Sequence, residues 1–131
     1  MNRATRIGFL FLLPIFAAVL APFLEVRAQE LSFVRGQKLN HMLSVCIDKK
    51  DALAILDADE KHGFAAASVI WEAADKCSSI PVMGALVGKV VKVARVKRGE
   101  KVVTARVVEI VNDGEVIGYF FTTATVDERN S

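Results

Sequence analysis

The chain has 131 residues, of which 17 are lysine or arginine and 15 are aspartate or glutamate, and 53% of its residues are hydrophobic. This length suits one compact domain with a single core. The nearly balanced charge gives no electrostatic basis for binding nucleic acid, so we expect no nucleic-acid partner.

Residues 1–28 have the order of parts that is typical of a secretory signal peptide. Arg3 and Arg6 precede an uncharged apolar run over residues 7–24, and Ala28 provides a small residue at which cleavage can occur. A signal peptide directs the chain to an oxidising compartment, where cysteines form disulfides. We therefore predict a periplasmic or secreted protein.

An uncleaved membrane anchor is the alternative for the same residues, because the apolar run approaches the length that spans a bilayer. Pro14 and Pro22 disfavour this alternative, since each removes a backbone donor that lipid cannot replace. We predict that residues 1–28 are cleaved and that residues 29–131 form a single small α+β domain with no membrane span. This domain would carry 14 basic and 14 acidic side chains.

The segment over residues 29–45 contains one helical signal. Four apolar residues recur there at the spacing of a helix: Leu39, Met42, Leu43 and Cys46. We therefore expect a helix that begins after Gly36, preceded by an extended arm.

Two helices are predicted next, joined by a very short connection. Asp48 is a favourable N-cap for the first helix, and Gly63 is a typical residue for its end. The second helix begins at Phe64, and its apolar residues recur at helical spacing as far as Cys77. The short connection predicts that the two helices pack antiparallel.

Cys46 and Cys77 are the only cysteines of the chain. They lie at nearly equal distances along the chain from the turn between the predicted helices, so they would meet at the open end of an antiparallel hairpin. We therefore predict a disulfide between them, to which the chain-entropy model assigns about 3 to 4 kcal/mol. A disulfide leaves no thiolate for a metal or for catalysis, and we predict neither a metal site nor a cofactor.

After Ile80-Pro81 the sequence becomes rich in valine, which favours strands. Three strands are predicted, over residues 86–97, 101–111 and 115–126. The turns between them are short, and Asn112-Asp113-Gly114 is typical of a hairpin, so we expect an antiparallel meander. The predicted fold is α+β: a disulfide-clamped antiparallel helical hairpin packed on a three-stranded antiparallel β-meander.

Charge is unevenly distributed along the chain, with acidic residues predominating over 48–77 and basic residues over 78–111. We predict a candidate binding patch on the strands that would meet an acidic partner. It consists of Lys92, Arg95, Lys97, Arg98 and Arg106. The alternative is that two solvated surfaces simply carry opposite charge.

Two stretches resemble ligand-binding or metal-binding motifs, but neither has the residues at the spacing that the motif requires. The stretch 84–89 has three residues between its glycines and lacks the Ser or Thr of a phosphate-binding loop. The stretch 57–63 lacks the glycine that an EF-hand needs at its sixth position. His41 and His62 are the only histidines, and neither has metal-ligand spacing with a cysteine. We predict no catalytic residue.

The sequence therefore predicts a non-catalytic binding or accessory module of the cell envelope, whose partner is another envelope or secreted protein. The first alternative is an inhibitor of a secreted or periplasmic hydrolase, in which the turn at 98–100 or at 112–114 enters an active site. The second alternative is a small hydrolase that uses His62 as its base.

Overall fold

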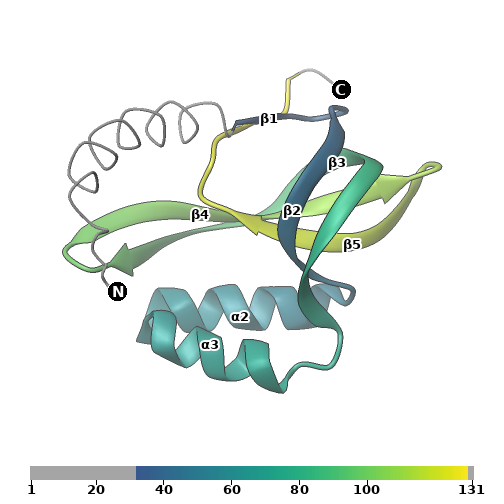
Figure 1. Ribbon diagram of the computed structural model, residues 1–131. Helices are drawn as coiled ribbons and strands as arrows, with labels where there is room; N and C mark the ends of the chain where they lie inside the picture. Colours follow the sequence, from purple (N-terminus) through teal and green to yellow (C-terminus); the bar gives the residue numbers. More distant parts are fainter. Residues whose placement is uncertain (1–31, 130–131) are drawn as a thin grey trace, which may run out of the picture. The chain divides into compact units, whose positions relative to one another are not determined.

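Antiparallel strands make up most of residues 32–129, the part of the chain that the computed structural model describes (Figure 1). The predicted signal peptide lies outside these described residues. In chain order the elements are β1 (Phe33–Val34), β2 (Lys38–Cys46), α2 (Lys49–His62), α3 (Phe64–Ala73), β3 (Cys77–Arg98), β4 (Lys101–Asn112), β5 (Glu115–Thr122) and β6 (Val126–Asp127). The predicted mixture of helices and strands is thus confirmed.

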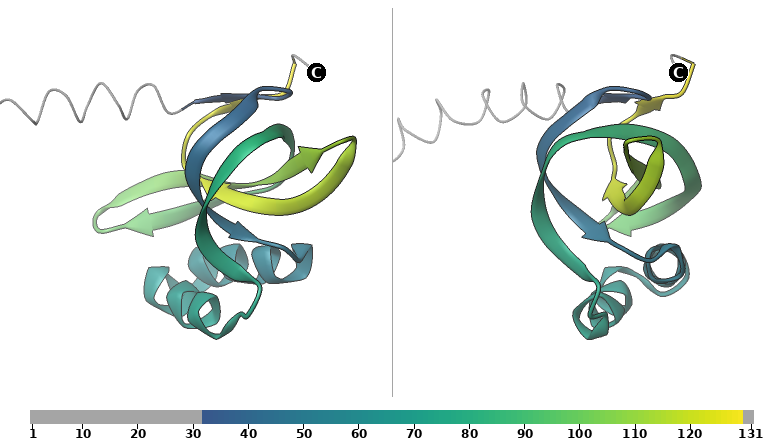
Figure 2. Two further views of the ribbon diagram at one scale, coloured as in Figure 1. Left: turned by 45° about the vertical axis from the view of Figure 1, so that its right-hand side comes forward. Right: turned by 90° about the vertical axis from the view of Figure 1, so that its right-hand side faces the viewer.

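The four long strands form one antiparallel sheet that closes on itself in the order β2–β3–β4–β5 (Figure 2). Strand β5 returns to β2, where Val45 pairs with Phe120 and Cys46 pairs with Tyr119. The helices are an insertion between β2 and β3, and α2 contacts all four long strands. The predicted helical hairpin on a three-stranded meander is therefore wrong, because a fourth strand completes and closes the sheet.

The fourth strand is β2, in the segment where a helix was expected after Gly36. Its residues alternate: Leu39, Leu43 and Val45 are buried, whereas Met42 is 69% exposed. A short apolar segment fits a period of 2 and a period of 3.6 almost equally well. Pairing with β3 along most of its length decides in favour of the strand.

Strand β3 is much longer than the predicted strand over 86–97, because it begins at Cys77. Its first half pairs with β2 and its second half pairs with β4, and Leu86 has a partner in each. The preceding helix α3 therefore ends at Ala73 instead of continuing to Cys77. Gly84 adopts a φ of 91° near the point where β3 changes partner, a conformation that favours glycine.

Gly88 lies at a second irregular point of β3, where the register with β4 shifts between Val87 and Val90. A Cβ added at Gly88 would lie 2.8 Å from the Cβ of Glu109 and 2.8 Å from a methyl carbon of Val111. We predict that Gly88→Ala lowers the free energy of unfolding by about 1 to 3 kcal/mol, because β4 has to move.

Denaturant unfolding measures this change, and Ser78→Ala on the exposed surface of the same strand is the matched control. The control should change the stability by no more than about 0.5 kcal/mol. Equal stabilities for Gly88→Ala and the native protein would show that β4 does not approach β3 so closely.

Helix α2 has the predicted ends: Asp48 is its N-cap residue and Gly63 follows its last residue. The Asp48 side chain makes no capping hydrogen bond within the described residues, and its carboxylate lies 3.5 Å from the Lys76 ammonium instead. The buried face of α2 includes Ile55 and Leu56 and packs on the sheet. The predicted bounds of α2 are confirmed, and Asp48 occupies the N-cap position without the side-chain hydrogen bond that this residue type commonly makes there.

The predicted disulfide between Cys46 and Cys77 is confirmed. The two residues are direct cross-strand partners at the end of β2 and the start of β3. The disulfide therefore joins β2, which precedes the helical insertion, to β3, which follows it. The prediction placed the cysteines at the open end of a helix pair, but both belong to strands, since β3 starts earlier than expected.

The buried side chains form two clusters, one on each side of the sheet. The first lies between the helices and the sheet, and it includes Leu56, Ala67 and Val107. The second lies inside the closed sheet and includes Leu39 and Phe120, both fully buried. The sheet thus has two apolar faces, which explains why its valine-rich strands do not alternate cleanly.

The short strands β1 and β6 pair in parallel near the ends of the described chain. Asp127 of β6 accepts three hydrogen bonds from Arg129, two from the guanidinium and one from the backbone N–H. The side-chain hydrogen bonds of Arg129 contribute most to lowering the pKa of Asp127, which falls from 3.8 to about 2. Ionised Asp127 therefore stabilises the fold above about pH 4, and this contribution is lost as the pH falls from about 4 towards 2.

We predict that Arg129→Gln raises the pKa of Asp127 towards 3.8, because the donors and their positive charge are removed together. Side-chain carboxyl NMR shifts, followed over pH 1.5 to 6, measure the change. Lys101→Gln, which removes an exposed positive charge at the start of β4, is the matched control and should leave the Asp127 titration unchanged. An unchanged Asp127 titration would contradict the described contact with Arg129.

Candidate functional site

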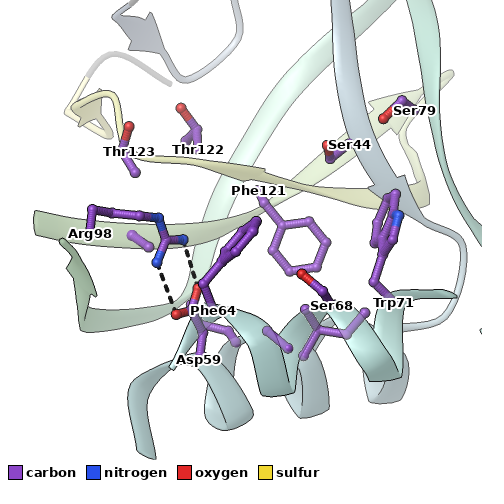
Figure 3. Close-up of a pocket in the computed structure, with 14 residues that line it drawn as sticks. Ser44, Asp59, Phe64, Ser68, Trp71, Ser79, Arg98, Phe121, Thr122 and Thr123 are labelled. Atoms are coloured by element: carbon purple, nitrogen blue, oxygen red, sulfur yellow. Dashed lines mark hydrogen bonds and ion pairs between the residues drawn. The ribbon is translucent and has the colours of Figure 1, made fainter. Parts of the chain in front are cut away.

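A cavity of about 310 Å³ lies between the helices and the sheet, and we call it the helix–sheet cleft (Figure 3). Helices α2 and α3 line one side with Ile55, Leu56, Asp59, Phe64, Ala67, Ser68 and Trp71. The sheet and the segment after β5 line the other side with Ser44, Ser79, Arg98, Ala105, Phe121, Thr122 and Thr123. A volume of this size is at the lower end of the range for small-molecule sites.

Aromatic side chains form the middle of the helix–sheet cleft. Trp71 of α3 and Phe121 of β5 meet edge to face, with 6.1 Å between ring centres. Phe64, the first residue of α3, is 61% exposed and lies over the same cavity (Figure 3). Helix α3 is strongly apolar, yet it buries little more than Ala67 against the rest of the described chain. Its apolar side chains are therefore available to the cleft and to solvent.

A bidentate ion pair closes one side of the cleft. The Arg98 guanidinium donates to both carboxylate oxygens of Asp59, at 3.0 Å and 2.7 Å. The Asp59 side chain is only 8% exposed, while that of Arg98 is 36% exposed. The hydrogen bonds to Asp59 are the main cause that raises the pKa of Arg98. The guanidinium also lies 4.7 Å from the centre of the Phe64 ring, in a cation–π arrangement.

The remaining polar side-chain groups of the described lining residues are the indole N–H of Trp71 and five hydroxyls, from Ser44, Ser68, Ser79, Thr122 and Thr123. The Thr122 hydroxyl accepts a hydrogen bond from the backbone N–H of Ala124. Of the described residues that line the cleft, none is histidine, lysine or cysteine. The site can therefore offer apolar surface and neutral hydrogen-bonding groups, and the two charged side chains among its described lining residues, Asp59 and Arg98, are paired with each other.

The two histidines lie away from the cleft. The ring of His41 meets that of Phe33 edge to face, with 5.4 Å between centres. His62 is the last residue of α2 and is exposed. Neither residue lines the cleft, so the suggested base His62 is not brought together with the serines that do.

The structure separates the five residues of the predicted basic patch. Lys92 and Arg98 face α2, where the Lys92 ammonium lies 3.6 Å from Asp57 and Arg98 pairs with Asp59. The other three, Arg95, Lys97 and Arg106, lie on the opposite face of the β3–β4 pair, as the cross-strand register shows. Part of the predicted charge complementarity is therefore satisfied within the chain itself.

Lys92 and Arg106 each interact with a neighbouring group of the chain. Asp57 has a lowered pKa, chiefly because Lys61 donates a hydrogen bond to it and, to a smaller extent, because Lys92 is near. The Arg106 guanidinium donates to the backbone carbonyl of Ala124 at 3.0 Å. Arg95 and Lys97 are exposed. These two residues are the members of the predicted patch that are best placed to meet a partner.

A second cavity of about 290 Å³ lies near the tip of the β4–β5 hairpin, and we call it the apolar hollow. Its exposed lining residues include Ile47, Ile80, Met83 and Ile117, with exposed fractions from 40% to 70%. Asn112 is the one polar side chain among the described lining residues. Neither cavity follows from local sequence patterns, although the strongly apolar composition of α3 indicates that this helix has surface to cover.

Within residues 32–129, no group of three or more histidine, cysteine, aspartate or glutamate side chains is arranged to hold a metal ion. No helix in the same range has both the length and the apolar character needed to cross a bilayer. Comparison of the chain with protein-family models, with curated proteins and with solved structures gives no significant match.

Proposed function

We propose that this chain is an exported, non-catalytic binding module of the cell envelope, and that the helix–sheet cleft is its binding site. The observation that carries the proposal is the composition of the cleft: aromatic and aliphatic walls, hydroxyls, and one ion pair whose charges cancel. Binding pockets commonly combine apolar walls with a few placed polar groups.

The covalent structure supports the exported part of the proposal. The disulfide between Cys46 and Cys77 fits an extracellular or otherwise oxidising compartment. The order of basic, apolar and small residues in 1–28 is that of a signal peptide. The disulfide also ties the helical insertion to the sheet at its base, and this insertion forms one wall of the cleft.

The partner we propose is another envelope or secreted component that places an apolar group in the cleft. Crosslinking in the native envelope, followed by mass spectrometry, tests this with three forms of the protein. These are the native chain, Ser68→Leu, which narrows the cleft from α3, and Met83→Ser, which alters only the apolar hollow.

We expect the native chain and Met83→Ser to capture the same partner and Ser68→Leu to lose it. The captured chain should begin at Gln29 and be two hydrogens lighter than the reduced form. Loss in Met83→Ser with retention in Ser68→Leu would move the binding site to the apolar hollow. A chain that still carries residues 1–28 would contradict cleavage of the signal peptide.

The alternative function, an inhibitor of a secreted hydrolase, is favoured by the two tight hairpin turns. The turn at Gly99-Glu100 and the turn at Asp113-Gly114 are exposed, and they lie at opposite ends of β4 (Figure 1). Such tips can enter a concave active site. A stoichiometric block of one secreted hydrolase that is lost in Glu100→Lys, but not in Ser68→Leu, would select this alternative over the cleft.

A further inference from the structure

We infer that the group that enters the helix–sheet cleft is uncharged and mostly apolar, with the size of a small molecule. This inference rests on the proposed function and specifies the class of ligand for the same site. It follows from the charge of the cleft, from its walls, and from the positions of its hydroxyls.

The charge of the cleft is the first argument. Asp59 and Arg98 are the two charged side chains among the described lining residues, and two hydrogen bonds join them. A charged ligand would lose its hydration on entering the cleft and would find no opposite charge that is not already paired. An uncharged ligand has no such penalty, so the cleft selects for neutrality.

The walls are the second argument. Seven of the lining residues are aliphatic or aromatic: Ile55, Leu56, Phe64, Ala67, Trp71, Ala105 and Phe121. Displacing water from such walls is favourable for the apolar surface of a ligand. The edge-to-face contact of Trp71 with Phe121 keeps their ring planes at 77°, which creates a corner suited to a flat or cyclic apolar group.

The hydroxyls are the third argument. Thr122 and Thr123 lie on the Arg98 side of the cleft, and Ser44 and Ser79 lie on the Trp71 side (Figure 3). Hydroxyls both donate and accept, so they can satisfy a carbonyl, an ether or a hydroxyl without requiring charge. The expected ligand therefore has an apolar body and a small number of neutral polar groups.

Two fluorescent probes that share one skeleton test the inference. N-phenylnaphthylamine is neutral, and anilinonaphthalene sulfonate adds one negative charge to the same ring system. Trp71 is the single tryptophan of the chain and lines the cleft, so its emission reports occupancy directly. The titrations use the purified, disulfide-bonded exported protein.

We expect the neutral probe to bind with a stoichiometry of one and to quench Trp71, and the sulfonate to bind at least tenfold more weakly. Ser68→Leu should weaken the neutral probe at least tenfold, whereas Met83→Ser should leave its affinity unchanged. Asp59→Asn leaves the Arg98 charge without its carboxylate, so the affinity for the sulfonate should rise at least fivefold. If Asp59→Asn does not fold, the inference is still tested by the affinities of the two probes for the native protein and by the affinity of the neutral probe for Ser68→Leu.

Equal or tighter binding of the sulfonate to the native protein would overturn the inference, as would neutral-probe binding that Met83→Ser abolishes. The envelope capture experiment separates this failure from failure of the proposed function. The capture experiment could find a partner that Ser68→Leu loses while the native protein still binds the sulfonate more tightly than the neutral probe. In that case the chain would remain a binding module, and only the inferred class of the bound group would be wrong.

Discussion

Loss of the disulfide between Cys46 and Cys77 should lower the free energy of unfolding by about 3 to 4 kcal/mol. The bridge closes a loop with a sequence separation of 31, and this loop contains both helices. In the chain-entropy model the stabilisation comes from restricting the unfolded chain. Since small domains have only about 5 to 15 kcal/mol in total, this is a large share of the stability. Guanidinium denaturation of the native protein and of Cys46→Ala/Cys77→Ala measures it.

Chemical reduction of the native protein is the control, and it should shift the unfolding midpoint in the same direction as the double substitution. The effect should also be uneven within the molecule. Amide hydrogen exchange should accelerate more in α2 and α3, which the bridge ties to the sheet, than in β4, which is held on both sides by β3 and β5. Equal midpoints with and without the disulfide would contradict its assigned role.

Replacing Arg98 by methionine should cost about 2 to 3 kcal/mol of stability, because the carboxylate of Asp59 would remain in a buried position without its partner. A fully buried pair typically loses roughly 3 to 5 kcal/mol in this way. We expect less here, since the Arg98 side chain is 36% exposed and solvent already screens part of its interaction. Urea denaturation at neutral pH measures the change.

A double-mutant cycle with Asp59→Leu, Arg98→Met and the double variant separates the energy of the Asp59–Arg98 pair from the loss of other Arg98 contacts. Asp59→Leu/Arg98→Met replaces both charges by apolar groups, and it should be more stable than Arg98→Met alone. Lys97→Met, on the exposed neighbouring position of β3, is the matched control and should change little. Additive effects of the two single substitutions would show that Asp59 and Arg98 are not coupled.

The features that sequence predicts best here are those fixed by nearby residues. Gly63 ends α2 where expected, and strand β4 has nearly its predicted bounds because a tight turn lies at each end. Asp113 and Gly114 both have positive φ, as a two-residue hairpin requires. The disulfide could also be predicted, since an exported chain with two cysteines has one possible intramolecular pairing.

The closed sheet could not be predicted because it depends on pairing between distant segments. Leu39 and Leu43 fit either a helix or a strand, and only β3 as a neighbour decides between them. Closure then rests on Val45 and Cys46 meeting β5, more than 70 positions further along the chain. Local propensity contains no information about such contacts.

The helix–sheet cleft escaped prediction for the same reason, since its lining comes from both helices and all four long strands. The Asp59–Arg98 pair joins residues 39 positions apart. The sequence contains a basic stretch, which predicts Arg98 as part of an external binding patch. Its actual partner lies within the chain, because α2 packs over the strand that carries it.

The most direct test of the helix–sheet cleft as the binding site is an NMR titration of isoleucine methyl groups with N-phenylnaphthylamine. Ile55 lines the cleft, whereas Ile47, Ile80 and Ile117 line the apolar hollow, so one labelled amino acid reports on both cavities. We predict that the Ile55 methyl signal shifts in a saturable manner while the other three stay in place. Saturable shifts of Ile80 and Ile117 with Ile55 unchanged would contradict the assignment of the cleft.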